Sequence, residues 1–125
     1  MSSYGELNAA VVDDSRFIRE YVSAALTHIG LKSVDSFESG GAALNAIEKN
    51  IKHYHLVVCD LNMPGVDGVS IMRWLSESHY QGGVVLISGE NRKLLKTVAT
   101  VARANKLNVL GTLAKPIRED LDYFG

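Results

Sequence analysis

The sequence contains only one cysteine and no long hydrophobic run, and these two features exclude several classes of protein. With only Cys59, the chain cannot form an internal disulfide framework, which fits the reducing cytoplasm. Its apolar stretches are far shorter than the ~20 residues that a membrane-spanning helix requires. The first ten residues, MSSYGELNAA, have neither the basic start nor the apolar stretch of a signal peptide. We therefore expect a cytoplasmic protein that does not enter the membrane.

The sequence also lacks an excess of charge of either sign. It has 13 Lys and Arg residues against 14 Asp and Glu residues, for a formal net charge of −1. Because nucleic-acid-binding domains normally carry a basic surplus, we expect no binding of nucleic acid by this domain. The length of 125 residues suits one domain with its own core.

Short apolar segments alternate along the chain with segments of helical periodicity. The apolar segments in the middle of the chain are hydrophobic at every position, which is typical of parallel strands that helices cover on both faces. The pattern predicts an α/β fold, a doubly wound five-stranded parallel sheet. Strands are expected at residues 7–12, 32–37, 55–60, 83–88 and 108–113. Helices are expected to begin near Ser15, Ser39, Gly68 and Asn91, with at most a short last helix at 118–124.

Two of the expected helices carry clear apolar stripes, and we expect these residues to face the core. In the first helix the stripe ends just before Gly30, a residue that suits a helix C-terminus. The stripes consist of Ile18, Val22, Ala25, Leu26 and Ile29 in the first helix, and of Leu94, Val98, Val101 and Ala102 in the fourth.

Polar residues follow four of the five expected strands, at the point where each strand ends. Each of them alone could be an ordinary helix-capping or turn residue. In an open parallel sheet, however, the carboxyl ends of neighbouring strands meet at one edge, and this edge is where ligands bind. The residues are Asp13 and Asp14 after the first strand, Asp60 and Asn62 at the third, Ser88 at the fourth and Lys115 after the fifth.

This combination of side chains predicts a site for one phosphoryl group. Three carboxylates close together repel unless a cation lies between them, and ligands that are all oxygen favour a hard ion such as Mg²⁺. Lys115 offers a compact positive charge for phosphoryl oxygens, and Ser88 offers a hydroxyl donor. A carboxylate can itself attack phosphorus, so Asp60 is the expected phosphoacceptor, with Asp13 and Asp14 holding the metal.

The sequence resembles the receiver domain of two-component response regulators over nearly its whole length. The similarity rests on four segments, which occur in the order found in the family: VVDD (11–14), CDLNMPGVDG (59–68), LISG (86–89) and AKP (114–116). The resemblance implies a flavodoxin-like (βα)5 fold and a phosphorylation-dependent signalling switch rather than an enzyme with a separate substrate. It implies that a sensor histidine kinase or a phosphotransfer protein phosphorylates Asp60 in the presence of Mg²⁺.

The resemblance also assigns roles to individual residues around Asp60. The backbone carbonyl of Asn62 would complete the metal shell, and Ser88 and Lys115 would bind the phosphoryl group. Asn62 and Glu90 stand at the positions that set the lifetime of the phosphoryl group, and the small Gly89 should leave the site open to solvent. A departure from the family concerns Thr112, which occupies a position where an aromatic residue is usual. We therefore do not expect an aromatic side chain to move with Ser88.

The end of the sequence suggests that residues 1–125 form the receiver domain of a longer regulator. The segment LNVLGTLAKPI (107–117) is similar to the corresponding stretch of regulators that carry a C-terminal EAL-type cyclic-di-GMP phosphodiesterase. The resemblance implies an output domain of this kind, or a partner at the face formed by the fourth helix and the fifth strand.

Two alternative functions remain open from the sequence. A HAD-like phosphohydrolase also uses an aspartate nucleophile with Mg²⁺, but it needs a second acid at position 62, where this chain has Asn62, and its cap domain would not fit in 125 residues. A pseudo-receiver that binds a partner without phosphorylation is disfavoured by the complete set of acidic, hydroxyl and lysine residues. The unusual Thr112 keeps it as an alternative.

Overall fold

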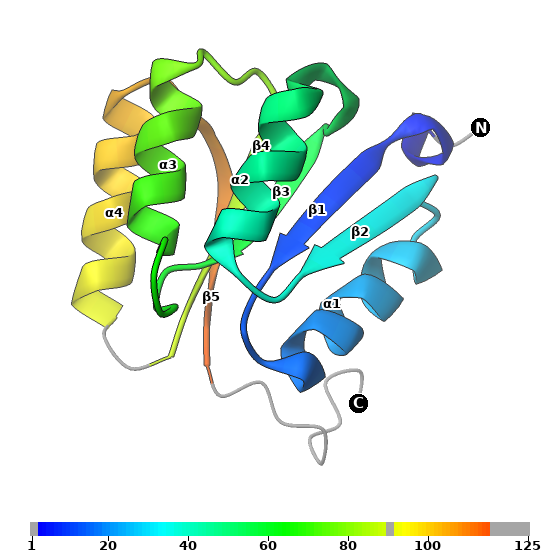
Figure 1. Ribbon diagram of the computed structural model, residues 1–125, viewed down its shortest axis with the longest axis horizontal. Coiled ribbons are helices and arrows are strands. Elements are labelled where there is room, and N and C mark those ends of the chain that lie inside the picture. The colour runs from blue at the N-terminus through cyan, green and yellow to red at the C-terminus, as the bar shows by residue number, and fades with distance from the viewer. Residues whose placement is uncertain (1–2, 90–91, 116–125) are drawn as a thin grey trace.

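Five parallel strands form one sheet in the order β2-β1-β3-β4-β5 (Figure 1). This arrangement is seen in a computed structural model that describes residues 3–89 and 92–115. All four pairs of neighbouring strands are parallel, as the sequence predicted. The strands are β1 (Asn8–Val12), β2 (Ser33–Phe37), β3 (Leu56–Asp60), β4 (Gly83–Ser88) and β5 (Asn108–Ala114).

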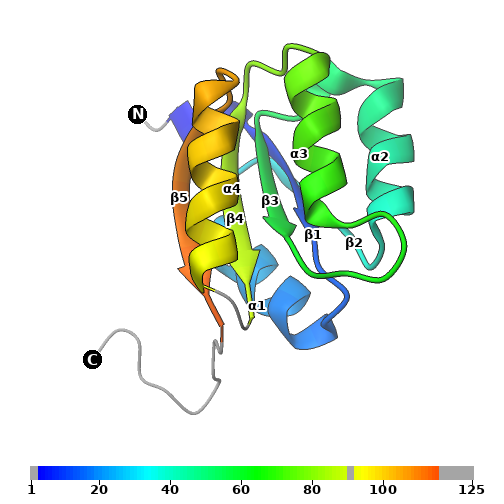
Figure 2. The same cartoon turned by 90° about the vertical axis from the view of Figure 1, so that its left-hand side faces the viewer.

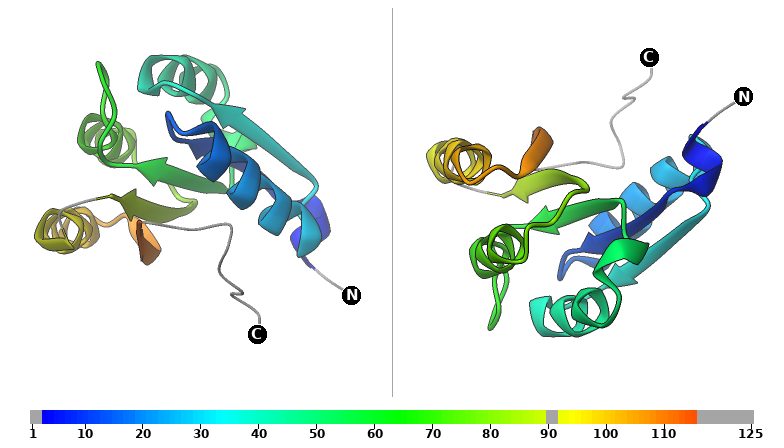
Figure 3. Two further views of the ribbon diagram at one scale, coloured as in Figure 1. Left: turned by 90° about the horizontal axis from the view of Figure 1, so that it is seen from below. Right: turned by 90° about the horizontal axis from the view of Figure 1, so that it is seen from above.

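Helices cover both faces of the sheet, which confirms the doubly wound α/β prediction (Figures 2 and 3). One face is covered by α2, α3 and α4, and the other by α1. The helices are α1 (Arg16–His28), α2 (Gly40–Lys49), α3 (Gly68–Glu77) and α4 (Arg92–Ala104), and two short 3₁₀ turns lie at Ser3–Glu6 and Ile51–His53.

The core consists of two clusters of buried apolar residues, one on each face of the sheet. The larger cluster lies between the sheet and α2, α3 and α4, and the smaller one lies beneath α1. Strand β1 is buried at all five positions, because helices cover both of its faces and strands flank it on both sides. Since the strands cannot shift without exposing these side chains, their carboxyl ends are held at fixed positions.

Polar side chains fix the start of three helices. Ser15 accepts a hydrogen bond from the backbone N–H of Ile18 (3.3 Å), as expected for the N-cap of α1. Ser39 caps α2 in the same way, and Asp67 caps α3. Each cap satisfies a backbone donor that the first helical turn leaves unpaired. The caps therefore set where the chain turns from the sheet edge into the next helix.

The predicted inward faces of α1 and α4 were only partly right. In α1, Ile18 and Val22 are buried, but Ala25 is exposed, and Ile29, the cap residue that follows the helix, is 51% exposed. In α4, Val101 is 52% exposed, while Leu95 and Ala99 are buried against the sheet. The helix contacts both the sheet and α3, so its apolar face is broader than the sequence stripe.

The short last helix predicted at 118–124 lies outside the described residues. Among residues 3–89 and 92–115, none of the helices has the length and apolar character needed to cross a membrane.

Candidate functional site

The polar residues predicted from the strand ends lie together at one edge of the sheet. Asp60 is the last residue of β3 and Ser88 the last of β4, while Asp13 follows β1 directly and Lys115 follows β5. Figure 2 shows that these strands end at the same edge. The parallel topology therefore brings together side chains that are up to 102 residues apart in the sequence, the separation of Asp13 and Lys115.

Three carboxylates form an acidic cluster at this edge. Asp13, Asp14 and Asp60 each offer an oxygen atom, and the three atoms lie within 4.8 Å of one another. Asp13 is 0% and Asp60 1% exposed, whereas Asp14 is exposed to solvent. Backbone N–H groups orient the two buried carboxylates. Asp13 Oδ1 accepts from Ser15 N (2.8 Å), and Asp60 Oδ1 accepts from Asn62 N (3.1 Å).

Among the described residues, Lys115 provides the positive charge that pairs with the two buried carboxylates. Its Nζ lies 3.2 Å from Asp13 Oδ2 and 3.3 Å from Asp60 Oδ2. Burial by itself would lower the pKa of Lys115, but the carboxylates of Asp13 and Asp60 outweigh it, and the pKa is raised. The ammonium group is therefore charged across the physiological pH range and bridges the ends of β1 and β3.

One ammonium group does not fully compensate the two buried carboxylates. Burial raises the pKa of Asp13 and that of Asp60, although hydrogen bonds and Lys115 pull both pKa values down. The neighbouring carboxylate of Asp13 raises the pKa of Asp60 further.

The donor set of the cluster fits a hard divalent cation. The buried Asp13 Oδ2 accepts no hydrogen bond from any described residue, despite its short distance to Lys115 Nζ. Oxygen-only ligands in this number are the kind that Mg²⁺ takes when it keeps several waters. A bound cation would supply both the missing partner of this oxygen and the missing positive charge.

Ser88 and Asn62 lie beside Asp60 and contact each other. Ser88 is only 2% exposed, and its Oγ accepts a hydrogen bond from the side-chain amide of Asn62 at 3.3 Å. Gly89 lies next to the stem of Lys115, since a Cβ at position 89 would be 3.5 Å from Lys115 Cδ. The predicted metal contact of the Asn62 carbonyl stays a prediction. Glu90, predicted to influence the phosphoryl lifetime, lies outside the described residues.

Thr112 lies in β5, exposed and paired with Leu86 of β4. Strand β5 (NVLGTLA) contains no aromatic residue, and how the site signals without one stays a prediction.

Arg19 belongs to the site surroundings and was missed by the sequence analysis. Its guanidinium Nη1 donates to the backbone carbonyl of Asp13 at 2.9 Å, which fixes the loop between β1 and α1. Arg19 lies one turn after the cap residue Ser15 on α1, and no local pattern distinguishes it from a solvent-exposed helix residue. The contact depends on the turn of the chain after β1, which the sequence does not specify.

Cys59 is a buried core residue of β3. It is fully buried, its thiol donates to the carbonyl of Asp60, and burial raises the pKa of the thiol well above its ordinary value. It is therefore not a nucleophile in the folded protein.

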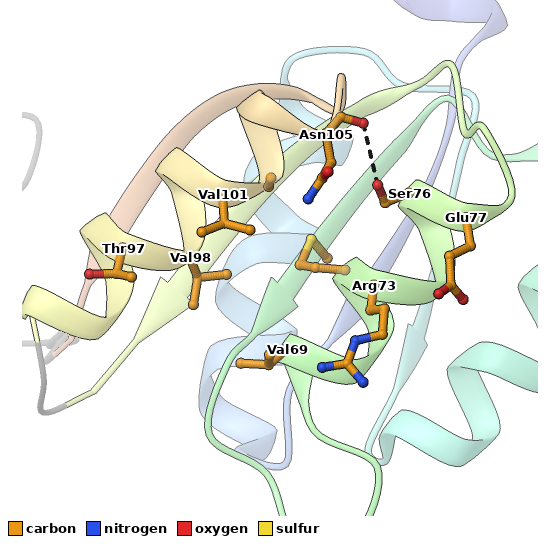
Figure 4. A pocket seen from close by; sticks show the side chains of 10 residues that line it. Val69, Arg73, Ser76, Glu77, Thr97, Val98, Val101 and Asn105 are labelled. Carbon is orange, nitrogen blue, oxygen red and sulfur yellow. Dashed lines mark hydrogen bonds between the residues drawn. The ribbon is translucent and has the colours of Figure 1, made fainter.

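A groove of about 310 Å³ lies between α3 and α4, separate from the acidic cluster (Figure 4). Its floor is apolar, and the Ser76 hydroxyl donates to the Asn105 carbonyl (3.3 Å) across one end. None of its lining residues belongs to the strand-end site. The groove therefore takes no part in the chemistry at Asp60.

Comparisons with known proteins agree with the fold and identify a family. A family model described as the response regulator receiver domain matches residues 9–121. The chain is 32% identical over 111 residues to the cyclic di-GMP phosphodiesterase RocR of Pseudomonas aeruginosa, an alignment that covers 89% of this chain but only 28% of RocR. It is 27% identical over 118 residues to the probable chemotaxis protein CheY of Rhizobium etli, with 93% of this chain and 86% of that protein covered. The crystal structure of a response regulator from Colwellia psychrerythraea matches with a TM-score of 0.74 at 27% identity, over 90% of this chain and 87% of that one.

Proposed function

The chain belongs to the response regulator receiver domain family, and from this premise we propose that it is a phosphorylation-dependent switch with Asp60 as the phosphoacceptor. The observation that carries the proposal is the Asp60 carboxylate, which is 1% exposed yet lies 3.3 Å from Lys115 Nζ within a cluster of acidic residues. Burying a carboxylate costs folding free energy that its pairing only partly offsets, so its presence points to a function, and the strand-end edge is where a ligand can reach it.

Phosphoryl transfer to Asp60 forms one bond and breaks one bond. A carboxylate oxygen of Asp60 forms the O–P bond, while the N–P bond of a phosphohistidine on a histidine kinase or phosphotransfer protein breaks, and the departing imidazole takes up a proton. The backbone N–H of Asn62 orients the carboxylate through Oδ1. Lys115 and Ser88 are placed to bind oxygens of the transferred group, by charge and by a hydroxyl donor respectively.

Asp13, Asp14 and Asp60, with the backbone carbonyl of Asn62, would hold Mg²⁺. When bound, the ion neutralises the negative charge that gathers on the phosphoryl oxygens. Without it, the transfer would bring further negative charge towards carboxylates whose pKa values burial already raises. We therefore expect phosphorylation to require the divalent cation.

The phosphorylated site communicates with the surface through β4 and β5. The backbone N–H of Lys115 donates to the carbonyl of Ser88 (2.8 Å), so movement of either residue towards the phosphoryl group displaces both strand ends. With Thr112 in place of an aromatic residue, the change would pass through the loops after these strands. The face that would change is formed by α4 and β5, where Arg92, Lys93, Lys96, Leu110 and Leu113 are exposed.

The output is proposed to lie in another part of a longer regulator, of which residues 1–125 are the receiver domain. The proposal of an EAL-type output is supported by the similarity to RocR, which is a cyclic di-GMP phosphodiesterase. The alignment covers 28% of RocR, so the remainder of that protein has no counterpart in residues 1–125. Alternatively, a separate partner protein binds the α4–β5 face, and phosphorylation of Asp60 controls that binding. In either arrangement the chain is a cytoplasmic phosphoacceptor that promotes its own phosphorylation and dephosphorylation, without turnover of a separate substrate.

The test of this function is incubation with Mg²⁺ and acetyl phosphate, followed by intact mass measurement at neutral pH. The wild type should gain one phosphoryl group, about 80 Da, in a Mg²⁺-dependent manner. Asp60→Asn should gain none. Asp67→Asn is the matched control, because Asn caps a helix as well as Asp does and α3 should be unaffected.

Two results would contradict the proposal. Absence of any adduct, together with absence of beryllofluoride binding, would identify a pseudo-receiver that binds partners without phosphorylation. Multiple turnover of small phosphate esters would instead favour the phosphohydrolase alternative.

A further inference from the structure

Arg19 of α1 is bonded to the turn that carries Asp13 and Asp14, two of the three carboxylates of the acidic cluster. Its guanidinium Nη1 donates to the backbone carbonyl of Asp13 (2.9 Å). Its backbone N–H donates to the carbonyl of Ser15 (3.0 Å), the first hydrogen bond of the helix. Asp14 lies between these two bonded carbonyls in the sequence. Arg19 therefore holds the turn between β1 and α1 on both sides of Asp14.

The contact with Arg19 is one of three that fix Asp13. The backbone N–H of Asp13 donates to the carbonyl of Phe37 (3.1 Å), and Asp13 Oδ1 accepts from the N–H of Ser15 (2.8 Å). With the carbonyl bonded to Arg19, each polar atom of Asp13 except Oδ2 has a hydrogen-bond partner. Oδ2 lies beside Lys115 Nζ but accepts no hydrogen bond from a described residue. The three contacts thus fix the orientation of a carboxylate whose one incompletely paired oxygen belongs to the cluster.

The charge of Arg19 takes part in no ion pair within the described part of the chain. Its guanidinium contacts a neutral carbonyl, so it takes up none of the carboxylate oxygens that a metal ion would need. Arg16, in the same turn of the helix, differs in both respects, because its side chain is 83% exposed and pairs with Glu20. The placement of Arg19 therefore suits a residue that fixes the main chain beside a metal ligand.

We propose that Arg19 is a positioning residue for the metal site: by holding the carbonyl of Asp13, it keeps the carboxylates of Asp13 and Asp14 in place for Mg²⁺. The inference rests on the proposed function, because it concerns the ion that phosphoryl transfer to Asp60 would require. Groups that orient metal ligands from outside the coordination shell typically change metal affinity by about 10- to 100-fold. Since this contact reaches a backbone atom rather than a ligand atom, its loss should weaken Mg²⁺ binding by about tenfold, the lower end of that range.

The sign of the effect separates positioning from charge. Removal of a positive charge near three carboxylates would by itself strengthen the binding of a cation. Arg19→Met keeps much of the aliphatic stem and removes both the charge and the donor, so weaker binding would report the lost contact. Arg19→Lys keeps the charge and a donor of similar reach, and it should bind Mg²⁺ within about threefold of the wild type.

Arg16→Met is the matched control, because it removes the same charge from the same turn of α1 and Arg16 contacts Glu20 rather than Asp13. It should bind Mg²⁺ as tightly as the wild type or more tightly. The experiment is calorimetric titration of the wild type and the variants with Mg²⁺ at one ionic strength. Thermal denaturation in EDTA shows that each variant is folded. Arg19→Gln, whose shorter side chain also loses the contact, replaces Arg19→Met if that variant does not fold.

Three results would overturn the inference: Mg²⁺ binding by Arg19→Met that equals or exceeds that of the wild type, a loss of the same size in Arg16→Met, or a loss of the same size in Arg19→Lys. A second readout is the rate of adduct formation from acetyl phosphate. Arg19→Met should need about tenfold more Mg²⁺ for half its maximal rate. At saturating Mg²⁺ its rate should be within about twofold of the wild type, because only binding of the ion is weakened. A variant that stays slow at saturating Mg²⁺ would indicate general disruption of the site and would contradict the positioning role.

Failure of this inference can be distinguished from failure of the proposed function. If the wild type binds no Mg²⁺, the proposed metal site fails and the inference fails with it. If the wild type binds Mg²⁺ but Asp60 gains no phosphoryl group, the proposed function fails, while the titrations still decide the role of Arg19. If the wild type is phosphorylated and Arg19→Met binds Mg²⁺ equally well, the inference alone fails.

Discussion

The close approach of α3 to the end of β3 can be tested with one added methyl group. A Cβ at Gly68, the first residue of α3, would lie 2.2 Å from the carbonyl oxygen of Asp60 and 2.7 Å from Leu61 Cα. Both are backbone atoms, so neither can turn away as a flexible side chain would. To reach ordinary contact at 3.4 Å or more, the start of α3 and the end of β3 must separate by more than 1 Å.

The expected cost of Gly68→Ala follows from this separation. Overpacking of a well-packed site costs about 1–3 kcal/mol, and the better helix propensity of alanine recovers only part of it. For a domain of this size, each kcal/mol lowers the melting temperature by roughly 3–5 °C. Because the displaced carbonyl belongs to Asp60, phosphorylation should also slow, by about tenfold or more, since a shift of ~1 Å in a reacting group can cost ~100-fold.

The assay combines thermal denaturation followed by circular dichroism with the rate of adduct formation from acetyl phosphate. Gly41→Ala is the matched control, because Gly41 lies in the first turn of α2 and a Cβ there would have no atom within 4 Å. It should leave stability unchanged or raise it by up to ~1 kcal/mol. If Gly68→Ala were as stable and as rapidly phosphorylated as Gly41→Ala, the fit between α3 and Asp60 could not be tight.

Three further predictions concern the buried polar groups. Because burial raises the pKa of Asp13 above 3.8, its ionisation reduces stability as the pH rises from about 3.8 through the raised pKa. Asp13→Asn should therefore have a higher melting temperature than the wild type at neutral pH in EDTA. Mg²⁺ at 100 times its Kd should raise the free energy of unfolding of the wild type by about 2.7 kcal/mol and that of the variant far less. A lower melting temperature of Asp13→Asn in EDTA would contradict this sign. Tyr80→Phe should lose about 1 kcal/mol in urea denaturation, because the buried Tyr80 hydroxyl donates to the Tyr54 carbonyl (2.9 Å), and unchanged stability would contradict the bond. Cys59 should react with Ellman's reagent only when the protein unfolds. Rapid reaction of the native protein would show that the reagent reaches β3 in the folded state.

The sequence was sufficient to predict the strand-end site because a parallel sheet determines which residues meet. Asp60 and Ser88 each end a strand that is buried along nearly its whole length, so the direction of the strands alone brings them to one edge. Lys115 follows the outermost strand, and its long side chain reaches inward to Asp13 and Asp60. These contacts depend on topology more than on side-chain detail, and topology is what the alternating pattern specifies.

Features that depend on packing between helices were not predictable in the same way. Val101 fits the apolar stripe of α4 as well as Ala99 does, but only the contact with α3 decides that Ala99 faces the sheet and Val101 the groove. The Asn62–Ser88 contact depends on the course of a loop, for which sequence gives no periodicity. Thr112 was recognised as a departure in the sequence, yet its exposure on β5 becomes evident only from the pairing of β4 with β5.

The central claim is that Asp60 itself becomes an acyl phosphate, and borohydride reduction tests it most directly. Borohydride reduces an acyl phosphate to the alcohol, so phosphorylated protein that is reduced, digested and sequenced by mass spectrometry should contain homoserine in place of Asp60. Unphosphorylated protein treated in the same way should retain aspartate at every position. Homoserine at Asp13 or Asp14, or no homoserine in a protein that has gained a phosphoryl group, would contradict the account.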